Sequence, residues 1–291
     1  MSLAVHVTRR TAERQRRELI QRIIAYVFLL AGTAVMAIPF FAMVVFSFQE
    51  PLDWATTYPK KLLPSWPISF ENYVRAHTYQ PWHWYYFNSI YIAGLTVIGE
   101  ILSSSLCAYS FARIRFPGRE LLFIILLATL MVPIYVTLVP TFFIMKELRW
   151  IDTHLPLWVP HWTGGAVSIF LLRQFFLTIP FELEDAAQID GAGPIQIWWR
   201  IMLPLSGPAL AVVAIFTFLF SWNDVLRPIV YLNTLEKYTV QIGMAFFKSP
   251  NQVDETAMMA IATIAVIPTL TVFMLTQRYF IRGIILSGFK G

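Results

Sequence analysis

Six long apolar segments, separated by short polar stretches, make up most of this sequence. A helix needs about 20 largely apolar residues to cross the hydrocarbon layer of a membrane, so the segments predict an all-α integral membrane protein built as a six-helix bundle. Charges in or near the fourth and fifth segments are expected at an interface or inside protein, because a charge at the bilayer centre is costly. The expected spans are roughly residues 23–48, 87–111, 121–143, 164–179, 208–230 and 257–280.

The composition also indicates a membrane protein. Of the 291 residues 57% are hydrophobic and only 13% are charged, whereas a soluble domain has about 25% charged residues. The net charge of +5 does not indicate nucleic acid, because the basic residues lie at the ends of the apolar segments, where they orient a membrane protein. Cys107 is the single cysteine and lies in an apolar segment, so neither a disulfide nor a thiolate metal site is predicted.

A cluster of arginines precedes the first apolar segment. The uncharged run that follows, residues 23–49, is longer than the core of a signal peptide, which is about 7–15 residues. We therefore expect a first spanning helix that is retained, with its N-terminus held in the cytoplasm by the arginines. These are Arg9, Arg10, Arg14, Arg16, Arg17 and Arg22.

The six spans assign each connecting segment to one side of the membrane. The predicted cytoplasmic side carries more Lys and Arg than the outer side, while acidic residues show no such bias, in agreement with the positive-inside rule. The cytoplasmic parts are the basic N-terminus 1–22, the loops 112–120 and 180–207 and the tail 281–291; the outer parts are 49–86, 144–163 and 231–256; and the membrane domain is 23–280.

The first outer segment is rich in aromatic residues and proline. Its rings could stack on sugars, but Trp and Tyr are enriched at any membrane interface, and the interfacial interpretation is favoured. The residues are Trp54, Tyr58, Pro59, Pro64, Trp66, Pro67, Tyr73, Tyr79, Trp82, Trp84, Tyr85 and Tyr86.

Motifs of catalysis and of nucleotide binding are missing from the sequence. No glycine is followed by lysine, so a GxxxxGK[ST] phosphate loop is excluded, and HExxH and GxSxG do not occur. The histidines are dispersed, and His154 and His161, which share an outer loop, are expected to be ordinary polar residues. No catalytic residue, metal site or cofactor is predicted.

The loop at 180–207 has the pattern of a helix, a bend and a second helix. Pro180 suits a first helical position, and acidic residues follow where a helix dipole is positive. Gly191 permits a bend, after which Pro194 can begin the second helix. Such a loop could dock on a partner or lie on lipid headgroups. The acidic residues are Glu182, Glu184 and Asp185, and the expected apolar face of the second helix is Ile195, Trp198, Trp199 and Met202.

The spacing of residues in this loop resembles the EAA loop of ABC importer permeases, in which EAA, three residues, Gly, nine residues and I-x-L-P follow one another. Every interval matches, and the departure is an Asp in place of the usual Glu. The matching residues are Asp185, Ala186, Ala187, Gly191, Ile201, Leu203 and Pro204, and the resemblance implies that these, with Glu184 and Asp190, form the contact with an ATPase.

Further segments resemble the carbohydrate-uptake branch of these permeases, in particular the shorter permease of the maltose and glycerol-phosphate type. They are 108–113, 116–119, 170–176, 221–224 and the ending 289–291. The resemblance implies a multi-pass protein of a bacterial or archaeal cytoplasmic membrane that carries a sugar or sugar derivative. It also implies three partners, which are a second permease subunit, a cytoplasmic ABC ATPase dimer and an extracytoplasmic solute-binding protein.

Polar residues inside the predicted spans are candidates for the translocation pathway, because buried ionisable groups are costly in a membrane. Glu100 could contact cargo, or it could pair with the partner permease. Asn223 and Asp224 are further candidates, although Asp224 can pair locally with Arg227 at i+3. Prolines that could kink spans three and six are Pro133, Pro140 and Pro268.

Two other classes of function are less consistent with the sequence. A secondary transporter or channel that works alone would need inverted repeats or its own ion site, and it has no use for a docking loop. An intramembrane enzyme would need a nucleophile and a base, for which no constellation is found.

Overall fold

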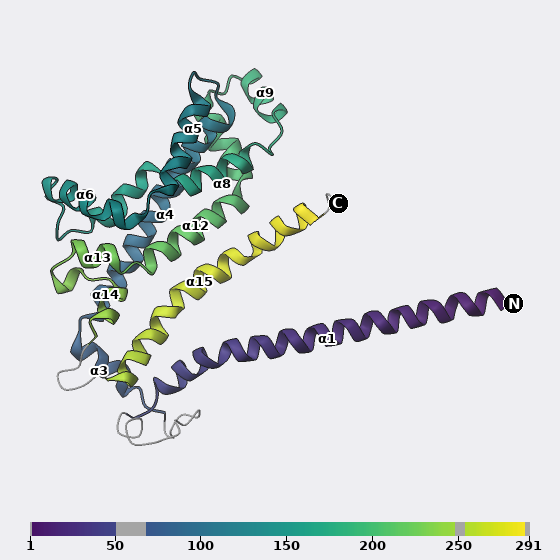
Figure 1. The fold of residues 1–291 in the computed structure, drawn as a ribbon, viewed down its shortest axis with the longest axis horizontal. Helices are drawn as coiled ribbons and strands as arrows, with labels where there is room; N and C mark the ends of the chain where they lie inside the picture. The colour runs from purple at the N-terminus through teal and green to yellow at the C-terminus, as the bar shows by residue number, and fades with distance from the viewer. Residues whose placement is uncertain (1, 51–67, 248–253, 289–291) are drawn as a thin grey trace. The chain divides into compact units, whose positions relative to one another are not determined.

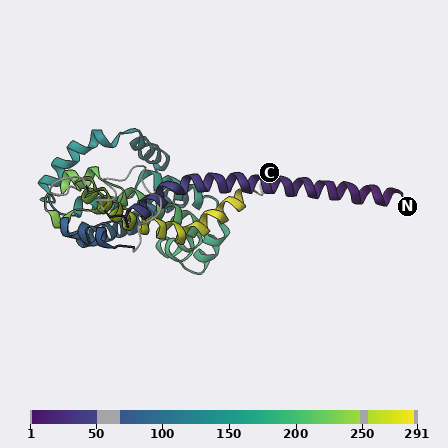
Figure 2. The same ribbon diagram turned by 90° about the horizontal axis from the view of Figure 1, so that it is seen from below.

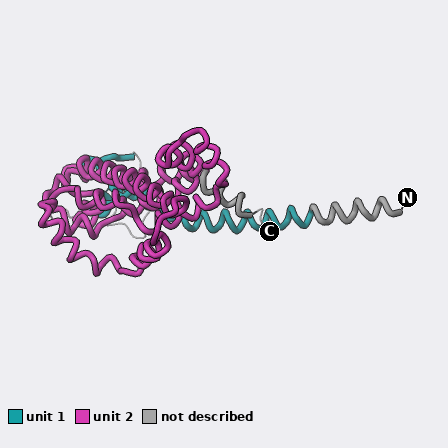
Figure 3. Tube along the Cα trace, turned by 90° about the horizontal axis from the view of Figure 1, so that it is seen from above, with its two compact units in different colours: residues 1–74, 254–263 teal, residues 75–253, 264–291 magenta. Residues whose placement is uncertain are grey.

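The computed structural model describes residues 2–50, 68–247 and 254–288, with side chains from residue 16 to residue 278 within these ranges. The described residues contain helices and no strand. They form two compact units, residues 1–74 with 254–263 and residues 75–253 with 264–291 (Figure 3). The predictions for the arginine side chains up to Arg14, for the aromatic residues from Trp54 to Pro67 and for the end of the tail lie outside the described residues.

The first unit contains α1 (Ser2–Phe46), the beginning of α3 (Glu71–Tyr79) and the beginning of α15 (Glu255–Gly288). α1 is a single long helix (Figure 2). The buried Asn72 joins these parts, because its amide donates to the carbonyls of Ser47 at 2.8 Å and Gln49 at 2.7 Å. Its Oδ1 accepts from the Thr256 hydroxyl at 3.1 Å. One amide side chain thus satisfies backbone groups just after α1 and binds the start of α15.

α4 (Trp82–Arg113) is the central helix of the second unit. It packs against α8 (Ala166–Phe176), α12 (Gly207–Trp222) and the short helix η2 (Val159–Thr163) (Figure 1). Residues four apart along a helix share one face, and here that face is made of small and polar residues that let neighbouring helices approach closely. The buried residues of this face include Thr96, Glu100, Ser104, Ala108 and Ala112.

The expected third span is broken, and a second bend lies just before the expected fifth span. The helices before and after Pro133 meet at 101°, which agrees with the predicted kink, and those before and after Ser206 meet at 82°. Pro140 and Pro268 lie within continuous helices. The remaining helices are α5 (Arg119–Ala128), η1 (Thr129–Met131), α6 (Ile134–Glu147), α7 (Leu155–Trp158), α9 (Glu182–Ile189), α10 (Pro194–Ile197), η3 (Trp198–Met202), α11 (Leu203–Leu205), α13 (Leu226–Tyr231), η4 (Leu235–Lys237) and α14 (Val240–Ala245).

Among the described residues, four helical segments are long and apolar enough to cross a membrane, and the number rises to six if each bent pair is one span. The six-helix prediction agrees with this upper count, but two boundaries differ from those expected. The fourth segment is Leu155–Phe176, which includes α7 and η2. The fifth was expected to reach residue 230, yet α12 ends at Trp222 and α13 begins separately at Leu226. The Asp224 carboxylate lies at this break and accepts from the backbone nitrogen of Arg227 at 3.3 Å, in the first turn of α13.

A polar cluster around Asp152 connects two predicted outer loops. Its Oδ1 accepts from the backbone nitrogens of Asn233 at 2.9 Å and Thr234 at 3.0 Å, and its Oδ2 accepts from the Thr234 hydroxyl at 2.6 Å and Lys237 Nζ at 2.8 Å. Burial would raise the pKa of this carboxyl, but the hydrogen bonds favour its charged form and lower the pKa. The charged carboxylate therefore stabilises the connection.

We predict that Asp152→Asn lowers the melting temperature near neutral pH. Since the folded pKa lies below the unfolded value of about 3.9, the stabilisation is present above about pH 4 and is lost as the pH falls through the folded pKa. Fluorimetric melting of the purified protein should give a difference from wild type that is constant above about pH 5 and begins to shrink as the pH falls below about 4. Glu182→Gln, at an exposed carboxylate, is the control. Equal melting temperatures near neutral pH would contradict the role of Asp152.

The six-span arrangement also predicts which side of the membrane each loop faces. In a Cys107→Ser background, Gln188→Cys in α9 should react with an impermeant maleimide only after the cells are permeabilised. Leu235→Cys, at an exposed position of a predicted outer loop, should react in intact cells. Rapid labelling at position 188 in intact cells would refute the orientation.

Candidate functional site

The loop at 180–207 lies at one end of the second unit, whereas α13 and α14 lie at the other end (Figure 1). α9 begins at Glu182, two residues after Pro180, and its first turn carries the expected acidic residues. Gly191 has a φ of +83°. The Ala192 nitrogen donates to the Ala187 carbonyl at 2.9 Å and the Gly191 nitrogen to the Gln188 carbonyl at 3.0 Å. This is a Schellman cap, which requires a left-handed residue at this position, so the predicted bend is present.

The second part of the loop begins at Pro194 as predicted, but its expected apolar face is wrong. Trp198 and Met202 are buried with Ile197, whereas Ile195 is 71% exposed and Trp199 is 56% exposed. The reason is that Trp198–Met202 forms a π-helix. Its wider turn shifts the residues that face the core away from the i, i+3, i+4 pattern of an α-helix.

Three of the residues that match the EAA pattern, Ala187, Gly191 and Ile201, line a hollow in the loop. Asp185, Ala186 and Asp190 are exposed, and Pro204 is exposed further along the loop. A cavity of about 470 Å³ is lined by Ala187, Asp190, Gly191, Ala192, Gln196, Arg200 and Ile201. The small side chains at its edge allow a partner surface to approach the backbone closely.

The resemblance assigned Glu184 to the contact with an ATPase, but its side chain faces inward, whereas those of Glu182 and Asp185 are exposed. Glu184 Oε1 lies 2.8 Å from Arg113 Nε, and the exposed side-chain fractions are 6% for Glu184 and 1% for Arg113. Burial raises the pKa of Glu184, which the charge of Arg113 opposes. Sequence reasoning did not single out Arg113, which lies at the end of an apolar segment. A cation at such a position usually indicates only which side of the membrane the loop faces.

Arg113 also binds the end of α8. Its Nη2 donates to the carbonyls of Phe176 at 2.6 Å and of Ile179, and its guanidinium lies 4.0 Å from the centre of the Phe181 ring. The last carbonyls of a helix have no partner inside it. One guanidinium therefore joins α4, the end of α8 and the beginning of α9.

A second polar group lies in the middle of α4. The residue Glu100 is 3% exposed. Its carboxylate accepts from the Gly165 nitrogen at 2.9 Å and the Ser104 hydroxyl at 3.2 Å. Its Oε2 lies 3.0 Å from His161 Nδ1. Glu100 is therefore bound by donors of its own chain, an arrangement that the sequence analysis did not consider.

The network continues from His161 to the break after α12. Arg227 Nη1 lies 3.1 Å from His161 Nε2, and Arg227 Nε donates to Asp224 Oδ2 at 2.5 Å, as the i, i+3 spacing predicted. Arginine only donates hydrogen bonds, so His161 Nε2 is the acceptor. His161 Nδ1 then carries the hydrogen and donates it in the hydrogen bond to Glu100. Asn223 is not part of this network, since its amide donates to the Leu219 carbonyl at 2.9 Å.

Glu100 and His161 border a cavity of about 660 Å³. The other lining residues are mostly apolar, namely Leu130, Gly165, Ala166, Val167, Ser168, Phe216, Thr217, Leu219 and Phe220. An apolar hollow with a few polar groups is the usual form of a small-molecule site.

Within the part of the chain that the structure describes, no three His, Cys, Asp or Glu residues lie close enough together to hold a metal ion.

Glycine allows η2 to dock on α4. A Cβ at Gly99 would lie 2.1 Å from the Trp162 ring, and one at Gly165 would lie 2.4 Å from a Glu100 oxygen. The Trp162 nitrogen donates to the Leu95 carbonyl at 3.1 Å. These contacts hold the segment that carries His161 against α4.

Comparison with known proteins decides the family. The profile of the binding-protein-dependent transport system inner membrane component matches residues 100–286, which include α4 from Glu100 onward, the loop at 180–207 and most of α15. The chain belongs to this permease family. It is therefore a multi-pass membrane protein of a transport system, in agreement with the resemblance found in the EAA pattern.

Several permeases of this family resemble the chain over most of their length. The arabinooligosaccharides transport system permease protein AraQ of Halalkalibacterium halodurans is 34% identical, covering 77% of this chain and 80% of AraQ. The sn-glycerol-3-phosphate permease UgpE of Yersinia enterocolitica is 37% identical, covering 68% and 71%. The diacetylchitobiose uptake permease NgcG of Streptomyces coelicolor is 31% identical, covering 88% and 84%.

A solved structure shares the fold of this permease. It is a chain of a bacterial ABC transporter involved in the import of the acidic polysaccharide alginate, with a TM-score of 0.79 and 24% identity. The match covers 91% of this chain and 98% of the other. The six-helix permease architecture predicted from the sequence is confirmed.

We predict that Gly99→Ala destabilises the permease, because its Cβ would displace the Trp162 ring and with it η2. Gly94→Ala is the matched control on the same helix, since nothing lies within 4 Å of its Cβ. The control should be neutral or stabilising, because Ala favours a helix by about 1 kcal/mol over Gly. The measurement is the melting temperature of the two purified variants. A Gly99→Ala variant as stable as the control would contradict the docking described for Trp162.

Proposed function

We propose that this permease forms half of the translocation pathway of an ATP-driven importer for a sugar or sugar derivative. Its partners are a second permease subunit, a cytoplasmic ABC ATPase dimer and an extracytoplasmic solute-binding protein in a bacterial cytoplasmic membrane. The names of AraQ, UgpE and NgcG support the cargo class, since arabinooligosaccharides, glycerol phosphate and diacetylchitobiose are all rich in hydroxyl groups.

The EAA loop is the proposed contact with the ATPase. The observation that carries this proposal is the hollow of about 470 Å³ at Ala187 and Gly191, next to a helix whose first turn carries the exposed acidic residues Glu182 and Asp185. Exposed apolar side chains beside it, Leu183 at 44% and Ile189 at 87%, are suited to burial against a partner. A hollow with an apolar border is better suited to a protein surface than to lipid headgroups.

ATP hydrolysis is assigned to the partner, because the sequence contains no phosphate loop. The permease then converts closure of the ATPase dimer into access from one side of the membrane or the other. Rigid-body movement of helices around a central pathway is the general means of such alternating access. The buried network of Glu100, His161 and Arg227 would support helices during this movement rather than drive it.

The experiment is Gly191→Val in the whole transporter reconstituted in liposomes. A β-branched residue resists the φ of +83° that the Schellman cap requires, so the loop should lose its shape and saccharide uptake should fall about tenfold or more. Uptake is measured together with ATP hydrolysis stimulated by the binding protein, and both are normalised to the amount of permease in the membrane.

Gly193→Val is the matched control, because Gly193 has an ordinary φ of −77° and nothing lies within 4 Å of its Cβ. Its uptake should stay close to that of wild type. Normal uptake by Gly191→Val at equal membrane level would mean that the loop does not couple the permease to the ATPase.

A further inference from the structure

Arg113 is the last residue of α4. Its buried guanidinium contacts the end of α8 and the first turn of α9, which belongs to the EAA loop at 180–207. We propose that Arg113 is the positioning residue that makes α4 and the EAA loop move as one body. The inference rests on the proposed coupling function and specifies how a displacement of the loop reaches the membrane domain.

The chemistry of the contacts favours arginine over any other cation. The guanidinium is a rigid fork that can bind several acceptors at once, whereas the lysine ammonium is a point charge on a flexible stem. Here one side of the fork meets the Glu184 carboxylate of α9, and Nη2 donates to the carbonyls of Phe176 and Ile179. The Phe181 ring covers the guanidinium at 4.0 Å. Phe176 is the last residue of α8, Ile179 and Phe181 lie between α8 and α9, and Glu184 lies in the first turn of α9.

Ala187 of α9 packs against an apolar cluster that contains Ala108, Tyr109 and Ala112 of α4. A cavity of about 370 Å³ lies between α9 and α4 and is lined by residues of both, including Tyr109, Arg113, Glu184 and Gln188. The ion pair therefore lies where side chains do not fill the space. Separating it would leave the buried Glu184 carboxylate without its cation, which is far costlier than moving the pair as a unit.

Arg173 adds a second connection at the same end of α4. Its Nε donates to the Phe111 carbonyl at 3.3 Å, and its guanidinium lies 4.1 Å from the centre of the Phe123 ring. α8 is thus bonded to the last turn of α4 while Arg113 bonds back to the end of α8. The α4 helix then extends from this junction to Glu100 and the His161 network, so it can carry a movement of the loop into the membrane.

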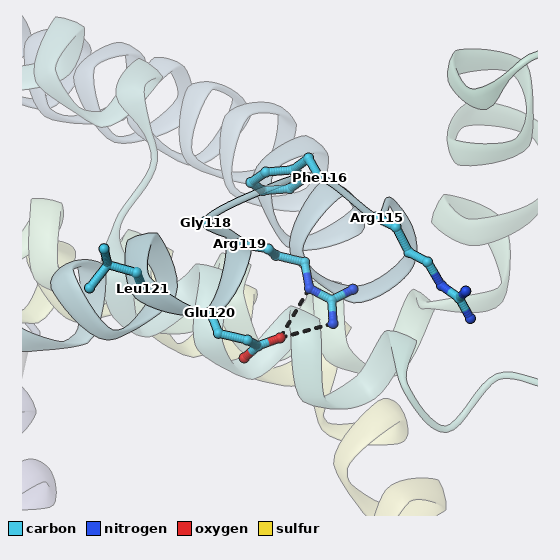
Figure 4. A pocket seen from close by; sticks show the side chains of 6 residues that line it. All are labelled: Arg115, Phe116, Gly118, Arg119, Glu120 and Leu121. Atoms are coloured by element: carbon cyan, nitrogen blue, oxygen red, sulfur yellow. Dashed lines mark hydrogen bonds and ion pairs between the residues drawn. The ribbon is translucent and has the colours of Figure 1, made fainter.

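The test compares Arg113→Gln and Glu184→Gln in the complete transporter, purified with its ATPase and binding protein. The control is Arg115→Gln, which removes a cation from the α4–α5 connection. Arg115 is exposed and extends away from the Arg119–Glu120 ion pair (Figure 4). Three quantities are measured, namely co-purification of the ATPase, basal ATP hydrolysis and hydrolysis stimulated by the binding protein.

We expect both variants to retain the ATPase and basal hydrolysis, because the hollow at Ala187 and Gly191 is unchanged. The stimulation of ATP hydrolysis by the binding protein should fall about tenfold. Arg115→Gln should behave as wild type. The double variant should be no worse than either single one, since residues that act through one contact are not additive. Arg113→Lys should restore only part of the stimulation, because it keeps the charge without the fork.

Full stimulation in both single variants, or equal loss in Arg115→Gln, would overturn the proposal. If Arg113→Gln does not accumulate in the membrane, Glu184→Gln and Arg113→Lys decide by the same criteria. A wild-type complex that fails to bind the ATPase at all would instead contradict the proposed function, so the two failures are distinguishable.

Discussion

The polar groups buried along α4 have to be satisfied without water, and the second unit is arranged around that requirement. An unpaired polar group in an apolar medium costs several kcal/mol, and several neighbours that pack on α4 supply a partner to it. η2 contributes His161, the start of α8 contributes the Gly165 nitrogen, and the end of α8 contributes carbonyls to Arg113. Helices that otherwise have no hydrophobic reason to associate in lipid are thereby held in one arrangement.

The same helix connects the two sites. Arg113 at its end binds α9 of the EAA loop, and Glu100 in its middle binds the network that reaches Arg227 and Asp224. Because α4 is an unbroken helix between these residues, a displacement at one end is not absorbed by a hinge within it. The breaks lie elsewhere, at Pro133 and at Ser206, where bent pairs can change their angle.

Glycine and small residues give this arrangement its close contacts. Gly99 and Gly165 leave room for the Trp162 ring and for the Glu100 carboxylate, while Gly191 supplies a backbone conformation rather than space. The two uses are physically different, since the first depends on volume and the second on the φ that only glycine adopts freely. The sequence analysis recognised the second use, because a glycine after a helix pattern is a local signal.

Local signals of the sequence determined the membrane class, the approximate spans, the kink at Pro133, the bend at Gly191 and the pairing of Asp224 with Arg227, because each depends on residues close together in the chain. The EAA spacing likewise identified the family without a structure. Only the tertiary structure decided that Glu184 faces Arg113, that His161 lies between Glu100 and Arg227, and that a π-helix turns Ile195 and Trp199 outward. These contacts join residues that are 61 apart for His161 and Glu100 and 66 apart for Arg227 and His161, and no periodicity within one segment encodes a partner on another.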